Sequence, residues 1–142
     1  MMESLVAVAA LLFPAEVAEQ PAAKTPAKPA AFALYQVERE IIQHTNRERA
    51  RRGLPALAAD ESLIKSARRH AIWMSSRRRL QHATTASAEN IAQGQSTARE
   101  AVSSWMHSAG HRANILSYRW SRIGVAAYVA ANGQIYWCQQ FE

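Results

Sequence analysis

The 142-residue sequence contains a single cysteine, Cys138, so no disulfide can form within the chain. The fold must therefore be stabilised by packing and hydrogen bonds instead of covalent cross-links. Cys138 ends the apolar stretch Ile-Tyr-Trp-Cys that begins at Ile135. In such a stretch we expect a small buried side chain and not a reactive thiol.

Long hydrophobic runs are also absent. The apolar run from Leu5 to Phe13 is too short to cross a bilayer as a helix, so no transmembrane span is expected. It suits the hydrophobic part of a secretory signal, and it predicts a signal peptide within residues 1–18 and export of the protein. Prolines among the Ala- and Lys-rich residues 19–33 predict an extended linker. We expect the folded domain to occupy residues 34–142.

The sequence lacks the short motifs of several enzyme classes. It contains no Gly-x-Ser-x-Gly nucleophile elbow, no His-Glu-x-x-His helix and no cysteine in a cationic setting. Consequently, no particular hydrolytic mechanism is favoured.

Acidic residues are in the minority, because 11 Asp and Glu face 17 Lys and Arg and the formal net charge is +6. This excess favours contact with acidic polymers, anionic lipid or nucleic acid, without choosing among them. The arginines at Arg49, Arg51, Arg52 and 77–79 are interpreted as solvated helix ends. No nucleic-acid-binding motif accompanies the charge, and export would separate the protein from nucleic acid, so no such partner is expected.

Apolar periodicity typical of helices is present in the first half of the domain. Apolar residues three and four apart predict a helix from Leu34 to about Arg52, where Gly53 ends it. Asp60 is the expected N-cap of a second helix that reaches about Arg77.

A third helix is predicted after Ser96 or Thr97 as its cap, with Gly110 as its stop. Trp105 shares one face of this helix with several small apolar residues, so we expect it to be buried between the helix and a sheet. From Ile123 onward, apolar residues alternate around an Asn-Gly pair, which predicts an antiparallel hairpin. Helices followed by terminal strands indicate a single α+β layered domain.

Two polar residues stand out against these patterns. His70 projects from the apolar side of the second predicted helix, which also carries Leu63 and Met74. Taken alone, a core histidine that is hydrogen-bonded to the backbone is the simpler interpretation. Glu89 lies in the small-residue segment 88–92, which is predicted as a loop that exposes the acid.

Six segments of the sequence share one order and spacing with a known family. They are 46–49, 53–57, 63–71, 88–92, 105–116 and 123–125, of which Trp-Met-His-Ser-Ala-Gly-His-Arg-Ala-Asn-Ile-Leu at 105–116 is the most diagnostic. Together they resemble the CAP domain, also called the SCP domain, of cysteine-rich secretory, antigen 5 and pathogenesis-related-1 proteins. Ala109 replaces the proline that is usual before the Gly-His-Arg. The lack of disulfides resembles the compact bacterial branch.

The resemblance implies an α+β fold, namely a CAP-type α-β-α sandwich with a small antiparallel sheet between helices. It also implies a cleft lined by His70, Glu89, Glu100 and His111. Glu100 and His111 would be about 16 Å apart along an unbroken helix, so the chain is expected to turn near Gly110.

Two imidazoles beside carboxylates can hold a divalent cation such as Zn, so His70 and His111 are the expected metal ligands. His82 and His107 are expected at the surface or behind these ligands. The leading hypothesis is an exported, monomeric binding module at the cell envelope or outside the cell, whose unknown ligand is a lipid or a cell-envelope polymer. The alternative is a metal-assisted hydrolase with Glu89 or Glu100 as general base.

Overall fold

The computed structural model describes residues 32–142, so the predicted signal peptide and most of the predicted linker lie outside the described residues. The described part contains four helices and four strands. In chain order they are α1 (Gln36–Ala50), β1 (Ala58–Ala59), α2 (Glu61–Arg77), β2 (Ala88–Gln93), α3 (Ala98–Met106), α4 (Ala109–Ile115), β3 (Arg122–Val129) and β4 (Ile135–Phe141).

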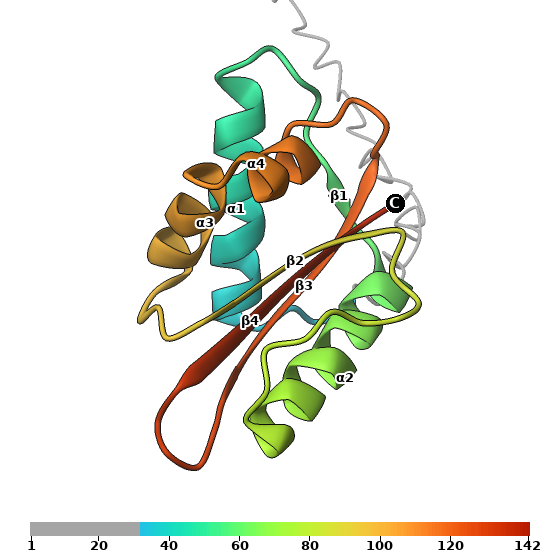
Figure 1. Ribbon diagram of the computed structural model, residues 1–142. Coiled ribbons are helices and arrows are strands. Elements are labelled where there is room, and N and C mark those ends of the chain that lie inside the picture. The colour runs from blue at the N-terminus through green and yellow to red at the C-terminus, as the bar shows by residue number, and fades with distance from the viewer. Residues whose placement is uncertain (1–31) are drawn as a thin grey trace, which may run out of the picture. The chain divides into compact units, whose positions relative to one another are not determined.

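The described elements form three layers (Figure 1). Helix α2 covers one face of the four-stranded sheet, whereas α1, α3 and α4 lie on the other side. The predicted α-β-α sandwich is confirmed. The sheet is mixed instead of purely antiparallel, because the short strand β1, which the sequence pattern does not predict, pairs parallel with β3. No helix within residues 32–142 is long and apolar enough to span a membrane.

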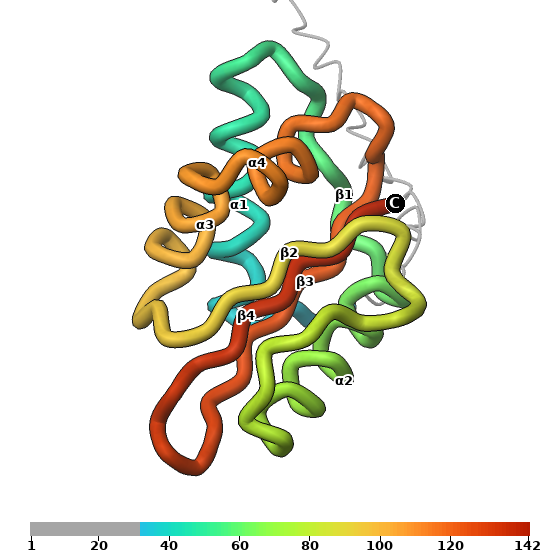
Figure 2. Tube along the Cα trace, viewed as in Figure 1, coloured from blue at the N-terminus to red at the C-terminus, as the bar shows by residue number. Residues whose placement is uncertain are grey.

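The strand order is β1-β3-β4-β2, so the last strand, β4, lies in the interior of the sheet between β3 and β2 (Figure 2). Strands β3 and β4 form the predicted hairpin, and Gly133 in its turn adopts a φ of 84° that suits glycine. The segment 88–92, predicted as a loop, is instead part of the edge strand β2. Within β2, the adjacent residues Ile91 and Ala92 are both buried, because they pack into the cores on opposite faces of the sheet.

The same alternation divides four buried polar side chains between the two layers. Glu89 lies opposite Gln140 on the face that α2 covers. Asn90 lies opposite Gln139 on the face of α1, α3 and α4. Because these side chains are buried, each needs a hydrogen-bond partner within the protein.

Helix α3 ends earlier than predicted. It stops at Met106, and Ser108, with φ of −113° and ψ of 122°, interrupts the helical backbone before α4 begins. Gly110 lies in the first turn of α4 and therefore does not stop a helix. The turn predicted near Gly110 exists, but the extended backbone of Ser108 produces it.

Arg49 does not lie at a solvated helix end, contrary to the sequence prediction. Its side chain is only 1% exposed, and its guanidinium donates to three backbone carbonyls, those of Pro55, Ile115 and Ser117. Burial lowers the pKa of Arg49. A planar group with five donors can serve several carbonyls at once, so Arg49 ties the end of α1 to the segment after α4.

The contacts of the domain begin two residues before the predicted boundary. The Arg68 guanidinium on α2 lies 5.2 Å from the centre of the Phe32 ring and donates to the carbonyl of Ala33 at 3.1 Å. Arg68 also forms a bidentate ion pair with buried Glu38, in which Nε and Nη2 donate to the two carboxylate oxygens at 2.6 and 2.7 Å. Phe32 and Ala33, assigned to the linker by composition, therefore contact the folded domain.

We expect Gly124→Ala to lower the free energy of unfolding by about 2 kcal/mol, the usual range for overpacking a core. Gly124 lies on β3 where the backbone of α2 passes closest, and a Cβ atom there would lie 2.1 Å from the backbone carbon of Leu63. Backbone cannot rotate away as a side chain can, so α2 would have to move. Urea unfolding measures the change, and Gly110→Ala, where a Cβ meets nothing within 4 Å, is the control.

Candidate functional site

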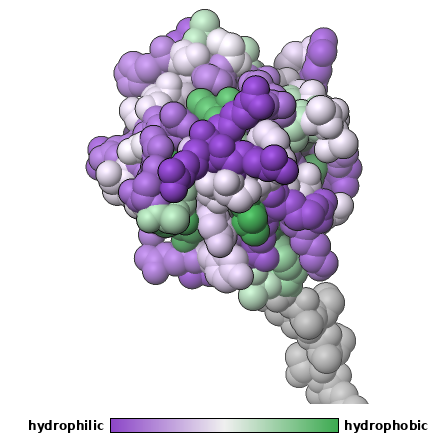
Figure 3. Space-filling view, turned by 60° about the horizontal axis from the view of Figure 1, so that its bottom comes forward, coloured by the Kyte–Doolittle hydropathy of each residue, from purple (hydrophilic) through white to green (hydrophobic). Residues whose placement is uncertain are grey.

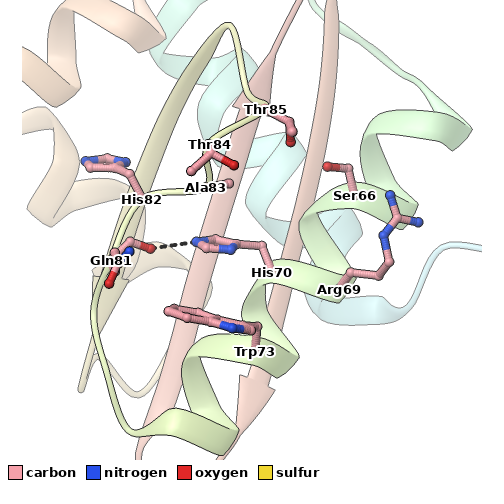
Figure 4. Close-up of a pocket in the computed structure, with 9 residues that line it drawn as sticks. All are labelled: Ser66, Arg69, His70, Trp73, Gln81, His82, Ala83, Thr84 and Thr85. Carbon is pink, nitrogen blue, oxygen red and sulfur yellow. Dashed lines mark hydrogen bonds between the residues drawn. The ribbon is translucent and has the colours of Figure 1, made fainter.

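A pocket of about 420 Å³ opens between α2 and the segment that connects it to β2 (Figure 4). Helix α2 contributes one wall, and residues 81–85 contribute the other. Of the four residues predicted to line the cleft, only His70 lines this pocket. The lining side chains include Ser66, Arg69, His70, Trp73, His82 and Thr84.

The His70 ring is fixed on two sides. It stacks against Trp73, three residues along α2, with ring centres 5.7 Å apart and planes 10° from parallel. Its Nε2 atom lies 2.6 Å from the carbonyl oxygen of Gln81 (Figure 4). A carbonyl can only accept, so this contact assigns the Nε2 proton to His70. The two contacts tie α2 to the opposite wall of the pocket.

Glu89 lies behind the pocket and is 7% exposed. Its Oε1 atom accepts from Nδ1 of His82 and from the backbone N–H of Ala83, both at 2.9 Å. Its Oε2 atom accepts from Nε2 of Gln140 at 2.8 Å. Nε2 of His70 lies 3.9 Å from Oε1. The exposed loop acid predicted from the sequence is therefore a buried carboxylate, because β2 is a strand and its residue 89 faces α2.

The thiol of Cys138 is the remaining neighbour of Glu89, with Sγ 3.6 Å from Oε2. Cys138 is fully buried, as predicted. Burial raises the pKa of the Cys138 thiol well above its usual value, and the nearby Glu89 carboxylate raises it further. This cysteine is a packed core residue, since a thiolate is disfavoured at this place.

His82 contacts the buried carboxylate of Glu89, a role that the sequence does not predict. The prediction places His82 at the surface or behind the metal ligands, whereas its ring bonds to Glu89 and 60% of its side chain is exposed. It therefore links the buried carboxylate to the solvent side of the pocket. No local pattern marks His82, because it lies in the irregular segment between α2 and β2.

His111 approaches the same region from the other layer. Burial lowers the pKa of His111, and the positive charge that His82 can carry lowers it further. Helix α4, which carries His111, packs beside the edge strand β2. The side-chain contacts join His70, His82 and Glu89 in one cluster, whereas within residues 32–142 the His111 ring forms no hydrogen bond or ion pair with any of these three.

A buried amide network holds α4 against the sheet. Nδ2 of Asn90 on β2 donates to the carbonyl of His111 and to Oε1 of Gln139, both at 3.0 Å. Asn114 on α4 donates to Oδ1 of Asn90 at 2.9 Å, and Gln139 donates to Oγ1 of Thr45 on α1 at 2.7 Å. The sequence does not predict that Gln139 and Gln140 are buried and hydrogen-bonded here. Two glutamines directly after the apolar run of a terminal strand were the signal that could have indicated it.

Glu100 and His107 lie elsewhere. Glu100 is in the first turn of α3, where its carboxylate accepts from the backbone N–H of Ser96 at 2.8 Å. Glu100 does not line the pocket of His70; it lines a separate depression together with Gln95 and Thr97. His107 is exposed, as predicted, and its Nδ1 bonds to the carbonyl of Ser103 at 2.7 Å.

The arrangement of the described side chains does not fit a three-ligand metal site. No group of three or more His, Cys, Asp or Glu side chains in residues 32–142 is placed to hold an ion. Both oxygens of Glu89 accept from protein donors, and Nε2 of His70 donates to a carbonyl. Of the two predicted ligands, His70 is thus already bonded to the carbonyl of Gln81, and the nearby carboxylate of Glu89 is occupied by His82 and Gln140.

We expect the stability of the protein to fall between pH 7 and pH 5 in part because of His111. In the unfolded chain His111 takes up a proton near its ordinary pKa of about 6.5, whereas the folded protein lowers this pKa. Below about pH 6.5 the unfolded state therefore binds more protons, so stability present above that pH is lost as the pH falls. Thermal unfolding of His111→Gln should show a shallower decline than the parent over this range.

The matched control for this measurement is His44→Gln, a histidine on α1 away from the cluster. Its pH profile should follow the parent. Identical slopes for the parent and His111→Gln would contradict a lowered pKa at His111.

The three-layer α-β-α fold, with histidines beside a buried glutamate between α2 and β2, is that of a CAP domain. The chain belongs to the cysteine-rich secretory protein family, whose CAP model matches residues 42–141. The Bacillus subtilis protein YkwD is 37% identical over an alignment of 134 positions, and the match covers 82% of this chain and 50% of YkwD. The chain therefore spans about half the length of this relative.

Solved structures of low sequence identity have the same fold. An SCP-domain extracellular protein of Bacillus anthracis matches with a TM-score of 0.62 and 24% identity, over 74% of this chain and 40% of that one. An outer surface protein of Borrelia burgdorferi matches with a TM-score of 0.63 and 15% identity, over 72% of this chain and 89% of that one. These structures show the fold, while the family model and the match to YkwD place the chain among CAP domains of bacterial type.

Proposed function

We propose that this CAP domain is an exported binding module whose ligand site is the pocket between α2 and residues 81–85. The observation that carries the proposal is the construction of this pocket. Its His70 ring is held by Trp73 and by the carbonyl of Gln81, and the buried Glu89 behind it holds His82. Rings held in this way lose little freedom when a ligand binds, which favours affinity.

The lining indicates the class of ligand. An indole and an imidazole offer flat apolar faces, while Ser66, Thr84 and Thr85 offer hydroxyls at the same opening. A sugar ring has both an apolar face and several hydroxyls, so a glycan segment of a cell-envelope polymer matches this lining. Glu89 is unsuited to act as a general base facing the ligand, because its two oxygens already accept from Ala83, His82 and Gln140.

Export is part of the proposal. It is supported by the apolar run from Leu5 to Phe13 and by relatives that are described as an outer surface protein and an extracellular protein. Cell fractionation with an antibody against residues 34–142 should find the protein outside the cytoplasm. Recovery of the full-length chain from the cytoplasm alone would contradict this part of the proposal.

The divalent ion expected at His70 and His111 remains a prediction that the proposed binding role does not need. Calorimetric titration of the protein with zinc at pH 7.5 tests it, beside the double variant His70→Ala, His111→Ala. Saturable uptake that the double variant loses would support a metal site. No uptake by the parent would leave the histidines as part of the hydrogen-bonded cluster.

The ligand site is tested by sedimentation of the protein with insoluble peptidoglycan sacculi in 150 mM salt. Trp73→Ala should lower the bound fraction at least about tenfold, because the stacking face and the support of His70 are lost together. Ile72→Ala, which truncates an exposed side chain beside Trp73 on α2, is the control and should bind as the parent does. Equal binding by the parent and Trp73→Ala would place the ligand elsewhere.

A further inference from the structure

A second depression lies between α1 and the α3–α4 pair, on the side of the sheet away from α2. Its volume is about 540 Å³. Five arginines line it, and they come from the end of α1 with the two residues that follow it, from α3 and from α4: Arg47, Arg51, Arg52, Arg99 and Arg112. We call this hollow the arginine depression. It shares no lining residue with the pocket on α2.

The charge in the arginine depression is unbalanced. Five guanidiniums line it against one carboxylate, that of Glu48, so its net charge is 5 − 1 = +4 with the histidines neutral. Glu48 is already shared, because it accepts from Arg51 at 2.7 Å and from Arg52 at 3.0 Å. Gathering like charges in one hollow costs folding free energy unless an anion joins them.

Several donors in the depression have no partner among the described residues. No hydrogen bond or ion pair from the side chains of Arg47 and Arg99 occurs within residues 32–142, and Arg112 uses one nitrogen, toward the carbonyl of Met106 at 3.2 Å. The lining also includes buried Val102 and half-buried Met106. The side chains of Arg47 and Arg99 are therefore exposed at the depression without a partner among residues 32–142.

Helix stability does not account for this arrangement. Arg47, Arg51 and Arg52 lie near the C-terminal end of α1, where cations suit the helix dipole. Arg99 is the second residue of α3, at the N-terminal end, where a cation is unfavourable. A cation placed against the dipole, and beside four others, indicates a role that the folded chain alone does not supply.

We infer that the arginine depression binds a soluble anion with two or more adjacent phosphate groups. Guanidinium groups recognise phosphate oxygens through paired N–H donors, and arginine is the preferred residue for this geometry. A single carboxylate offers about four acceptor sites, too few for the guanidiniums gathered here. A compact oligophosphate has both the charge and the number of oxygens to meet them.

The test is calorimetric titration with tripolyphosphate at pH 7.5 in 150 mM salt, on the intact protein and on Arg47→Gln, Arg99→Gln. These two side chains have no partner in the described residues, so the variant should fold as the parent does. We expect saturable binding by the parent and at least a tenfold loss in the variant. The control is Arg77→Gln, Arg79→Gln, which removes the same charge from exposed residues at the end of α2.

The outcomes separate a built site from diffuse charge. Equal losses in the two double variants would overturn the inference, because only net charge would then matter. Citrate that binds as tightly as tripolyphosphate would overturn the assignment to phosphate, and so would the absence of saturable binding by the parent. Arg47→Lys, Arg99→Lys keeps the charge but not the paired donors, and an intermediate affinity there supports recognition by guanidinium geometry.

Discussion

Replacing Trp105 with alanine should lower the free energy of unfolding by roughly 3 to 5 kcal/mol, the usual cost of truncating a buried tryptophan. Trp105 is 1% exposed in the core between the sheet and α1, α3 and α4. Its indole N–H donates to the carbonyl of Ile91 on β2 at 3.1 Å. Truncation therefore opens a cavity and also leaves a buried carbonyl without its partner.

Urea unfolding measures the loss, and Trp73→Ala is the control, because Trp73 lies at the open pocket and is only partly buried. The control should lose clearly less stability than Trp105→Ala. A change below about 1 kcal/mol for Trp105→Ala would be incompatible with a buried indole.

The elements that could be predicted from the sequence are those set by local signals. Asp60 caps α2 through a hydrogen bond to the backbone N–H of Leu63, and Thr97 caps α3 in the same way. Each cap lies directly before an apolar periodic segment, so neighbours in sequence carry the information. The β3–β4 hairpin belongs to the same group, since its two strands are joined by one short turn.

The strand β2 could not be predicted in this way. Its partner β4 follows more than forty residues later in the chain, as in the pairing of Glu89 with Gln140. Small residues such as Ala88 and Ala92 have weak strand preference, and only the burial of both faces makes the segment a strand. The prediction that Glu89 is an exposed acid in a loop is wrong for the same reason.

The candidate site, too, could be predicted only in part from the sequence. The family resemblance implies one cleft for His70, Glu89, Glu100 and His111, and the side-chain contacts of the structure join His70 and Glu89 with His82. Glu100, which the resemblance also implies, lies instead in the first turn of α3, where its carboxylate accepts from the backbone N–H of Ser96. Sequence position does not reveal which side chains line one hollow: the acid beside His70 is Glu89, whereas Glu100 lines a separate depression.

The two hollows of the molecule differ in chemistry as well as in place. The exposed surface is largely hydrophilic on the face drawn in Figure 3, where hydrophobic side chains form only small separate patches. The pocket on α2 combines aromatic and hydroxyl groups, whereas the arginine depression carries a concentrated positive charge. Because the sheet separates them, substitutions in one should leave ligand binding in the other unchanged.

Replacing Glu89 with alanine should lower the free energy of unfolding by about 3 kcal/mol and abolish binding at the pocket on α2. The stability cost arises because the amide of Gln140 and the backbone N–H of Ala83 both lose their acceptor, at about 1 to 3 kcal/mol for each stranded buried donor. Binding is lost because His82 is no longer held at Oε1 and the wall formed by residues 81–85 loses its anchor.

Glu89→Gln separates these two effects, because glutamine keeps the shape and one acceptor but carries no charge. Its oxygen can still accept from the N–H of Ala83, and its amide can donate to Gln140 if the Gln140 amide turns over. We therefore expect Glu89→Gln to recover most of the stability, measured by urea unfolding, together with binding to the sacculi. If Glu89→Gln is stable but does not bind, the negative charge on Glu89 itself matters to the ligand. If Glu89→Ala is as stable as the parent, the buried carboxylate is not the structural centre of the cluster.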